Sequence, residues 1–455
     1  MNPIDAKTIA QVTGGELVLG SGDQMVSTVS TDTRSVGEGD AFFALRGDRF
    51  DANDFAPQAA AAGAAVVVVE RWDGGADACG ATVIKVGDGL LALQRLARWQ
   101  RLQMEIPVVG ITGSNGKTST KDFTRAVLAR KYDVFATRGN LNNHIGVPLT
   151  LLALTPDHGA AVVEMGMNHA GEIAPLCEIA MPTMGVITNI GTAHIEYLGS
   201  RQGIAEEKGA LARALPSDGL LFVPAGCDFY DYFKSRTKAR VVPVGNGRGL
   251  IRAEHLVPKG GRTRFTLVIE DKEVAEVDLP SLGRHMVKNA LLAAGCGWFL
   301  GIDPEEIACG LSTAELTSGR LRRYESSGIT VYDDTYNANP ESMSAAIETL
   351  AETPVGDGGR RFAVLGPMGE LGGHGPEAHL EVGRLAASRG VAVISVGEGA
   401  EGIARGAGVP DHIPDGDAAS SILSNRFRPG DVVLFKASRS AAMEKVMNRV
   451  CPPNN

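Results

Sequence analysis

The sequence predicts an α/β protein that is divided into three domains. The chain has 455 residues, more than one hydrophobic core usually organises, and a prior of roughly 150 residues per domain suggests about three. Short apolar runs alternate with helical stretches in two long series, which is the rhythm of strands and helices in parallel sheets. Changes in this pattern divide the chain into predicted domains 1–82, 83–314 and 315–455.

The first predicted domain is a small N-terminal α/β unit. Its strand-like runs are GELVLG at 15–20, DAFFALRG at 40–47 and AAVVVVE at 64–70. The alanine-rich stretch at 59–63 favours a helix. Together these elements indicate a domain that ends near residue 82.

The central domain begins with a helix expected near 87–104. Its apolar strands are expected at 108–112, 133–137, 160–165, 184–190, 220–226 and 241–245. Helical stretches separate these runs, which predicts a doubly wound parallel sheet. The stretch 262–279 alternates more regularly between apolar and polar residues, so we expect a small antiparallel addition there.

The C-terminal domain repeats the parallel pattern. Its strands are expected at 328–334, 361–366, 391–397 and 431–438, and a helical stretch follows each one. We therefore expect a second α/β unit of the Rossmann-like kind.

The composition excludes several classes of function. The apolar runs are too short or too interrupted to cross a bilayer, and the first residues lack the long apolar segment of a secretory signal. The net charge of -9 comes without a basic stripe, so nucleic acid is not an expected partner. The six cysteines form no C-x-x-C pair, which argues against a zinc site or a disulfide framework. We expect a cytoplasmic protein with reduced cysteines and no membrane insertion.

The stretch GITGSNGKTS at 110–119 carries the strongest chemical signal. It follows an apolar strand and precedes a helix with Phe123 and Val127 on one face, so its glycines lie at a strand-to-helix turn. Free N–H groups and the positive end of the helix favour an anion there. Lys117 adds a positive charge and Thr118 a hydroxyl for Mg²⁺, which predicts a site for a nucleotide triphosphate.

This loop departs from the common phosphate-loop pattern G-x-x-x-x-G-K-[ST]. Ile111 occupies the position of the first glycine, so the loop is shorter and is closed by Gly113 and Gly116. The alternative interpretation is a glycine-rich turn that binds no ligand.

Two side chains follow strands at the same predicted sheet edge. Glu164 ends one strand, and a carboxylate at that place can hold Mg²⁺. His194 follows the next strand. The alternatives are a helix-capping or loop acid for Glu164 and a structural histidine for His194.

Lys208 lies on the apolar stripe of a predicted helix, with Ile204, Leu211 and Leu215. In one interpretation its ammonium group extends to the surface. In the other it is buried near a metal, where desolvation lowers its pKa and the neutral amine takes up CO₂ to become a carbamate ligand.

The motifs resemble those of the Mur ligases of bacterial cell-wall synthesis. GSNGKTS is similar to that family's shorter phosphate loop, G-x-x-G-K-T. The segments VVEMGMNHAGEI, TNIGTAHIEYLGS and EEKGAL, which contain Glu164, His194 and Lys208, match its two-magnesium site, in which the lysine is carbamylated. The similarity spans nearly the whole chain. It implies a UDP-sugar-binding domain, an ATP-binding domain and a mobile C-terminal domain. We expect a monomer, although no sequence feature decides the oligomeric state.

Further motifs resemble one branch of this family. STDTRSVGEGDAFFALRGDRFDANDF, TRGNLNNHIGVPLTLL, SGRLRR, YDDTYNANPESM and KASRSAAMEKV look like the branch that joins D-alanyl-D-alanine to UDP-N-acetylmuramoyl-tripeptide. The implied reaction transfers the γ-phosphoryl group of ATP to the terminal carboxylate of the tripeptide. The amine of the dipeptide then attacks the resulting acyl phosphate.

The resemblance also implies the roles of individual residues. Asn289 would contact adenine, Arg320 the terminal phosphate and Asp334 the ribose; alone, these are a helix-face amide, a surface cation and a strand-end acid. The residues expected to bind nucleotide are Gly113, Ser114, Asn115, Gly116, Lys117, Thr118, Ser119, Asn289, Arg320, Asp334 and Asn337. Those expected to act in catalysis are Lys117, His194, Lys208 and Arg320, and those expected to bind metal are Thr118, Glu164, His194 and Lys208. Those expected to bind the substrate are Ser30, Thr33, Arg34, Asn140, Asn142 and Asn143.

Two positions depart from the family pattern, and three alternative functions stay open. Asn53 stands where many relatives carry histidine, and Pro367 in LGPMGELG replaces an acidic residue. The alternatives are the ligase that adds the third amino acid, a folate polyglutamate synthetase, and a nucleotide-binding switch that hydrolyses without ligating. The motif DDTYNANP and the lack of an Asp-Asn-Pro-Arg stretch disfavour the first. The third residue of the tripeptide, meso-diaminopimelate or lysine, is also left open.

Overall fold

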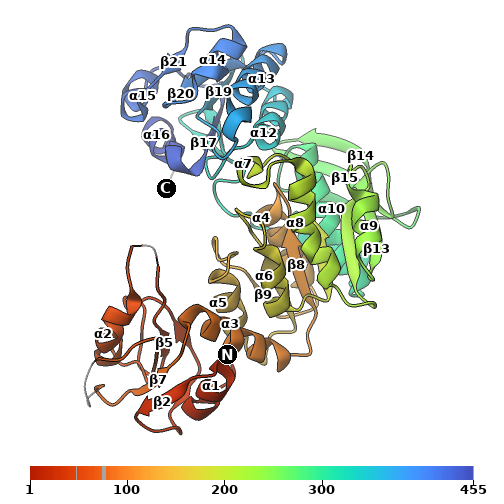
Figure 1. Cartoon of the computed structure of the whole chain (residues 1–455). Helices are drawn as coiled ribbons and strands as arrows, with labels where there is room; N and C mark the ends of the chain where they lie inside the picture. Colours follow the sequence, from red (N-terminus) through yellow and green to blue (C-terminus); the bar gives the residue numbers. More distant parts are fainter. Residues whose placement is uncertain (48, 74–77, 454–455) are drawn as a thin grey trace.

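The computed structural model describes residues 1–47, 49–73 and 78–453. Three bodies follow one another along the chain, and the central one lies between the other two (Figure 1). Each contains its own sheet, so the predicted α/β class with three domains is confirmed.

The N-terminal body contains a sheet of order β2-β7-β6-β5-β4, in which only β2 pairs antiparallel. Alternate residues of the buried run Val66–Val69 pack on opposite sides, with Val67 and Val69 against α2 and its neighbours. Its elements are β1 (Ile4–Asp5), α1 (Ala6–Thr13), β2 (Glu16–Leu19), β3 (Met25–Val26), β4 (Val29–Ser30), β5 (Ala41–Phe43), α2 (Ala56–Ala61), β6 (Val66–Val69) and β7 (Thr82–Lys85). Because the predicted boundary at residue 82 falls at the start of β7, we propose that this domain extends to Lys85.

The central body contains the sheet β16-β15-β14-β13-β12-β11-β8-β10-β9. Its elements up to β11 are α3 (Gly89–Leu102), β8 (Val108–Thr112), α4 (Lys117–Leu128), β9 (Val134–Ala136), α5 (Gly146–Leu152), β10 (Ala160–Glu164), α6 (Ile173–Ala180) and β11 (Met184–Ile187). Those after it are α7 (Ile195–Leu198), α8 (Arg201–Ala214), β12 (Leu220–Pro224), α9 (Tyr230–Arg236), β13 (Arg240–Asn246), β14 (Ile251–Lys259), β15 (Arg262–Ile269), β16 (Lys272–Leu279), α10 (Arg284–Phe299) and α11 (Pro304–Ser312).

Helices cover both faces of this sheet. Val109 and Val162 pack with α4, α10 and α11, whereas Val108 and Val163 pack with α3, α5, α6 and α8. The strands from β9 to β14 run parallel, and β14, β15 and β16 pair antiparallel. The doubly wound sheet and its antiparallel addition are therefore confirmed.

The C-terminal body contains the sheet β17-β18-β22-β19-β20-β21, in which only β17 pairs antiparallel. Its elements are β17 (Arg322–Ser326), β18 (Ile329–Asp333), α12 (Pro340–Glu352), β19 (Arg361–Leu365), α13 (Gly375–Ser388), β20 (Ala392–Val396), α14 (Glu401–Ala407), β21 (His412–Ile413), α15 (Gly416–Leu423), β22 (Val432–Lys436) and α16 (Met443–Val450). The second boundary, predicted at 314/315, falls in the connection between α11 and β17 and stays a proposal.

Two expectations from composition can be compared with the structure. None of the described helices combines the length and apolar character that a bilayer span requires. Cys177, Cys296 and Cys451 are buried thiols, as expected of packing residues, whereas Cys227 and Cys309 are only partly buried.

Candidate active site

A cleft of about 740 Å³ lies where the central and C-terminal domains meet, at the carboxyl ends of β8, β10 and β11. Parallel strands direct their carboxyl ends to one edge, which is why motifs far apart in the sequence converge here. Fifteen of the predicted site residues line it: Ser114, Asn115, Gly116, Lys117, Thr118, Ser119, Asn140, Asn142, Asn143, Glu164, His194, Asn289, Arg320, Asp334 and Asn337.

Two positions of the loop between β8 and α4 require glycine, because neighbouring atoms leave no room for a Cβ there. Gly113 has φ 153° and Gly116 has φ 79°. A Cβ at Gly113 would overlap Oγ1 of Thr188, and one at Gly116 would lie 2.6 Å from Oδ1 of the buried Asn289. The loop is therefore packed between Thr188, which follows β11, and Asn289 of α10. The shorter loop predicted from Ile111 fits in this space with glycine at both positions.

Replacing Gly113 by alanine should weaken ADP binding at least about tenfold, because overpacking costs about 1–3 kcal/mol and here displaces the loop. Isothermal titration calorimetry with ADP measures the effect. Gly87→Ala is the matched control, since a Cβ at Gly87 meets nothing within 4 Å. Equal ADP affinity in the two variants would contradict this account of the loop.

Side chains and carbonyls of the segment after β11 hold the loop in place. Ser114 N donates to the Asn189 carbonyl at 3.1 Å, and Asn115 N donates to Asn189 Oδ1 at 2.8 Å. Gly191 N donates to Ser114 Oγ at 2.9 Å. Asn189 was missed by the sequence reasoning, because an asparagine after a strand carries no signal of its own.

Lys117 is the first residue of α4, and its Nζ donates to the Gly113 carbonyl at 2.8 Å. Burial lowers the pKa of Lys117, and the nearby carboxylate of Glu164 opposes that shift. The ammonium group is thus held against the backbone of the loop between β8 and α4. This geometry supports the interpretation of the segment as a phosphate loop and disfavours the alternative of a turn that binds no ligand.

Glu164 is buried, with a relative exposure of 2%. Its Oε1 accepts a hydrogen bond from Asn142 Nδ2 at 2.8 Å, whereas Oε2 has no hydrogen-bond partner among the described residues. A buried carboxylate oxygen without a donor is costly unless a cation or water completes it. The cleft is lined both by Glu164, with its unpaired carboxylate oxygen, and by Thr118, which carries a hydroxyl; these oxygen donors are of the kind that a hard divalent cation prefers.

His194 precedes α7 and has a left-handed backbone, with φ 64°. Its Nδ1 lies 2.6 Å from Oε2 of Glu370, which belongs to the C-terminal domain. The contact has the distance of an ion pair without the alignment of a hydrogen bond. The His194 ring nevertheless lowers the pKa of Glu370. Glu370 was missed by the sequence reasoning, which considered its loop only at Pro367.

Lys208 is fully buried, with a relative exposure of 1%, so the alternative of a surface lysine is wrong. The apolar stripe of helix α8 faces the core, where Ile204 and Leu211 are buried. Desolvation, with repulsion from Lys117, lowers the pKa of Lys208 well below its usual value. Lys208 does not itself line the cleft, but its interaction with Lys117 places it close to the loop.

Arg320 lies in the connection between α11 and β17, and its side chain contacts Thr118 next to the phosphate loop. Its Nη2 donates to Thr118 Oγ1 at 3.3 Å, and its guanidinium lies 3.8 Å from the centre of the Tyr336 ring. Its Nε is buried without a hydrogen-bond partner in the described part of the chain. An oriented, incompletely paired guanidinium suits a phosphate group in this cleft.

Asp334 is held by a buried lysine of the same domain. Lys436 Nζ lies 2.6 Å from Asp334 Oδ2, and it donates to the Asn337 carbonyl at 2.9 Å. Leu321 N donates to Asp334 Oδ1 at 3.1 Å. Desolvation lowers the pKa of Lys436, an effect that Asp334 opposes. These bonds fix the Asp334 carboxylate at the C-terminal wall of the cleft.

Three long segments of the chain match domain models of one known family. The Mur ligase family catalytic domain matches residues 25–101, the Mur ligase middle domain matches 111–297, and the Mur ligase glutamate ligase domain matches 319–439. A curated relative from Synechocystis, UDP-N-acetylmuramoyl-tripeptide--D-alanyl-D-alanine ligase, is 39% identical over 95% of this chain and 94% of its own. The chain belongs to the Mur ligase family.

Solved Mur ligase structures share the whole architecture. A MurF structure from Acinetobacter baumannii superposes with a TM-score of 0.91 at 34% identity and covers 99% of both chains. MurF from Thermotoga maritima, solved in complex with ADP, gives a TM-score of 0.83 at 30% identity and covers 93% of this chain and 97% of its own. The resemblance inferred from the loop motifs is thereby confirmed.

The predicted substrate residues of this Mur ligase divide into two groups. Asn140, Asn142 and Asn143 line the cleft, and Asn143 Oδ1 also accepts a hydrogen bond from Gly146 N at the start of α5. Ser30, Thr33 and Arg34 lie in the N-terminal domain and are not part of the cleft. Arg34 is exposed and pairs with Asp32 at 2.6 Å.

The two departures from the Mur ligase pattern have local partners. Asn53 is buried; its Oδ1 accepts from Glu70 N at 2.8 Å, and its Nδ2 donates to Asp51 Oδ1 at 2.7 Å. The Pro367 carbonyl accepts from Ser438 N at 2.9 Å. Asn53 therefore links Asp51 to Glu70 by hydrogen bonds within the N-terminal domain. The hydrogen bond of Pro367 connects the segments that follow β19 and β22.

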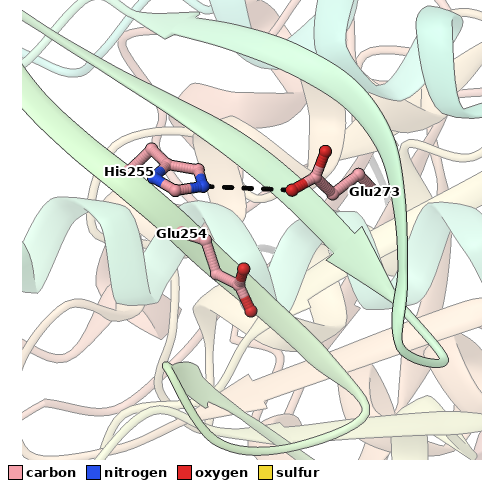
Figure 2. Close-up of side chains that lie close together, drawn as sticks. All are labelled: Glu254, His255 and Glu273. Atoms are coloured by element: carbon pink, nitrogen blue, oxygen red, sulfur yellow. Dashed lines mark ion pairs between the residues drawn. The ribbon is translucent and has the colours of Figure 1, made fainter.

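A second group of possible metal ligands lies outside the cleft of this Mur ligase (Figure 2). The His255 ring points toward Glu273, with Nε2 and Oε1 3.9 Å apart, and both side chains are exposed. Glu254 already accepts a hydrogen bond from Arg252 at 2.8 Å. We assign no metal to this surface group.

Proposed function

We propose that this Mur ligase joins D-alanyl-D-alanine to UDP-N-acetylmuramoyl-tripeptide at the expense of ATP. The products are UDP-N-acetylmuramoyl-pentapeptide, ADP and phosphate, in the synthesis of peptidoglycan precursors. The observation that carries this proposal is the cleft lined both by Lys117 of the phosphate loop and by Glu164, whose buried carboxylate oxygen is unpaired. The choice among the family's branches rests on relatives that bear this substrate name and span nearly the whole chain.

Lys117 and Arg320 are the residues that act on the triphosphate. Both side chains are oriented by groups of the protein, Lys117 by the Gly113 carbonyl and Arg320 by Thr118 and the Tyr336 ring. Preorganised positive groups offset the charge that spreads over a transferring phosphoryl group without reorganising during the step. The tripeptide carboxylate becomes an acyl phosphate and ADP leaves; the dipeptide amine then attacks the acyl carbon and phosphate leaves.

Mg²⁺ is the proposed metal, held by Thr118, Glu164, His194 and Lys208. When bound, it would supply charge neutralisation for the phosphates. Lys208 would contribute as a carbamate: its burial favours the neutral amine, which attacks CO₂ and loses a proton to give a carboxylate-like group. Asn289 against adenine and Asp334 at the ribose complete the proposed nucleotide site, and both residues line the cleft.

The N-terminal domain is proposed to bind the UDP part of the substrate through Ser30, Thr33 and Arg34. These residues lie outside the cleft, whereas Asn140, Asn142 and Asn143 line it, so the long substrate would extend from one domain to the other. We further propose a cytoplasmic location, because the reaction consumes ATP and the buried thiols of Cys177, Cys296 and Cys451 suit a reducing compartment. That the protein acts as a monomer is a separate proposal.

Phosphate release should require UDP-N-acetylmuramoyl-tripeptide, D-alanyl-D-alanine and Mg²⁺ together. Free D-alanine, lysine or glutamate as acceptor should give little turnover, because a shorter amine leaves polar groups of the acceptor site unpaired. Phosphate release measured across these acceptors tests the substrate. Turnover of ATP alone would favour a hydrolytic switch, and robust turnover with glutamate and a folate would favour a folate polyglutamate synthetase. Parallel assays with meso-diaminopimelate and lysine tripeptides identify the third residue.

A further inference from the structure

The loop after β19 of the C-terminal domain docks directly on the segment that carries His194. The Glu370 carboxylate lies 2.6 Å from His194 Nδ1, and the Glu370 carbonyl accepts a hydrogen bond from Glu196 N at 3.3 Å. A Cβ added to Gly372 would lie 3.2 Å from Cγ of Glu196. The backbone of this loop therefore contacts α7, and a side chain of the loop contacts the residue that precedes α7.

The two facing residues share an uncommon backbone conformation. His194 has φ 64° and Glu370 has φ 63°, in the left-handed region that residues other than glycine rarely occupy. Such conformations persist where surrounding contacts enforce them, often at functional sites. Here the conformation coincides with the approach of the two side chains across the domain boundary.

We infer that Glu370 is a positioning residue that orients the His194 imidazole, so that the C-terminal domain completes the metal site of the central domain. A neutral histidine can donate from Nδ1 to a carboxylate, which leaves the lone pair of Nε2 for a metal. Such a carboxylate partner fixes the ring and raises the basicity of the ligand.

Neighbouring contacts make this docking specific. Glu341 at the start of α12 accepts from Thr192 N at 2.8 Å, and Asn339 Nδ2 donates to Asn115 Oδ1 at 2.7 Å. These bonds bring α12 of the C-terminal domain against the phosphate loop and the segment before His194. Glu370 is thus held in register with His194 by bonds that do not involve either side chain.

This inference rests on the proposed function, in which His194 binds the metal, and direct metal binding tests it without any substrate. Mn²⁺ binding in the presence of ADP is measured by electron paramagnetic resonance in the full-length protein. Glu370→Gln should weaken Mn²⁺ binding about tenfold, because loss of such a partner typically costs about 10–100-fold in metal affinity. ADP affinity without metal, and the thermal unfolding midpoint, should stay unchanged.

Two controls separate positioning from a general effect of charge. Glu377→Gln removes the same charge from an exposed residue of α13 that pairs with Arg384, and it should leave Mn²⁺ affinity unchanged. In a His194→Ala background, Glu370→Gln should cause no further loss, because the ring that it orients is absent. An Mn²⁺ affinity unaffected by Glu370→Gln would overturn this inference but not the proposed metal site. So would an equal loss of affinity with His194 present and with His194→Ala. Failure of the unaltered protein to bind Mn²⁺ would overturn the proposed metal site as well.

Discussion

Lys117→Ala should lower the rate of phosphate release by about 10²–10³-fold or more, because one preorganised cation at a transferring phosphoryl group is typically worth that factor. The structure explains the specificity of the effect. Lys117 Nζ is held by the Gly113 carbonyl at 2.8 Å, so the positive charge is fixed at the loop by a contact within the protein. Steady-state phosphate release with saturating substrates, combined with ADP titration, gives both the rate and the change in nucleotide affinity.

The fold should survive this substitution. Lys117 lies at the start of α4, whose buried face is formed by Phe123, Val127 and Leu128, and its removal leaves that packing intact. Lys234→Ala, an exposed lysine in the last turn of α9, is the matched control and should keep wild-type activity. A correctly folded Lys117→Ala protein that releases phosphate at nearly the wild-type rate would rule out the proposed role of the loop.

Lys208→Ala should lower phosphate release by about 100-fold, because it removes a proposed metal ligand from a buried position. A short carboxylic acid such as acetate should partly restore activity, since it can enter the space left by the side chain and supply the missing carboxylate. Activity as a function of acetate concentration measures this rescue.

The matched variant is Lys208→Met, which fills the space with a side chain of similar length that cannot carry a carbamate. It should be as inactive as Lys208→Ala but should not respond to acetate. Mass spectrometry under native conditions should show an added mass of CO₂ only when Lys208 is present. A fully active Lys208→Met protein would show that this buried lysine serves packing alone.

Local sequence patterns predicted the parts of the site that one segment encodes. The strand, the glycines and Lys117 lie within ten consecutive residues, and their backbone requirements are met as expected. The place of Lys208 on the apolar face of α8 followed from the spacing of Ile204 and Leu211, and the structure then chose the buried interpretation over the surface one. The rule that parallel strands present their carboxyl ends at one edge predicted that Glu164 and His194 lie near the loop.

By itself, then, the sequence determined the α/β class, the phosphate-loop motif and the place of Lys208 on the apolar stripe of its helix, because each depends on the spacing of neighbouring residues. The burial of the Lys208 side chain was decided by the structure. Only the tertiary structure decided which groups meet across domains: Glu370 with His194, Asn339 with Asn115 and Arg320 with Thr118. It also decided the precise extent of the N-terminal sheet, since β7 pairs with β6 and β2 beyond the predicted boundary. The physical reason is that these contacts depend on how separate cores pack together, and no periodicity within a segment records the position of another domain.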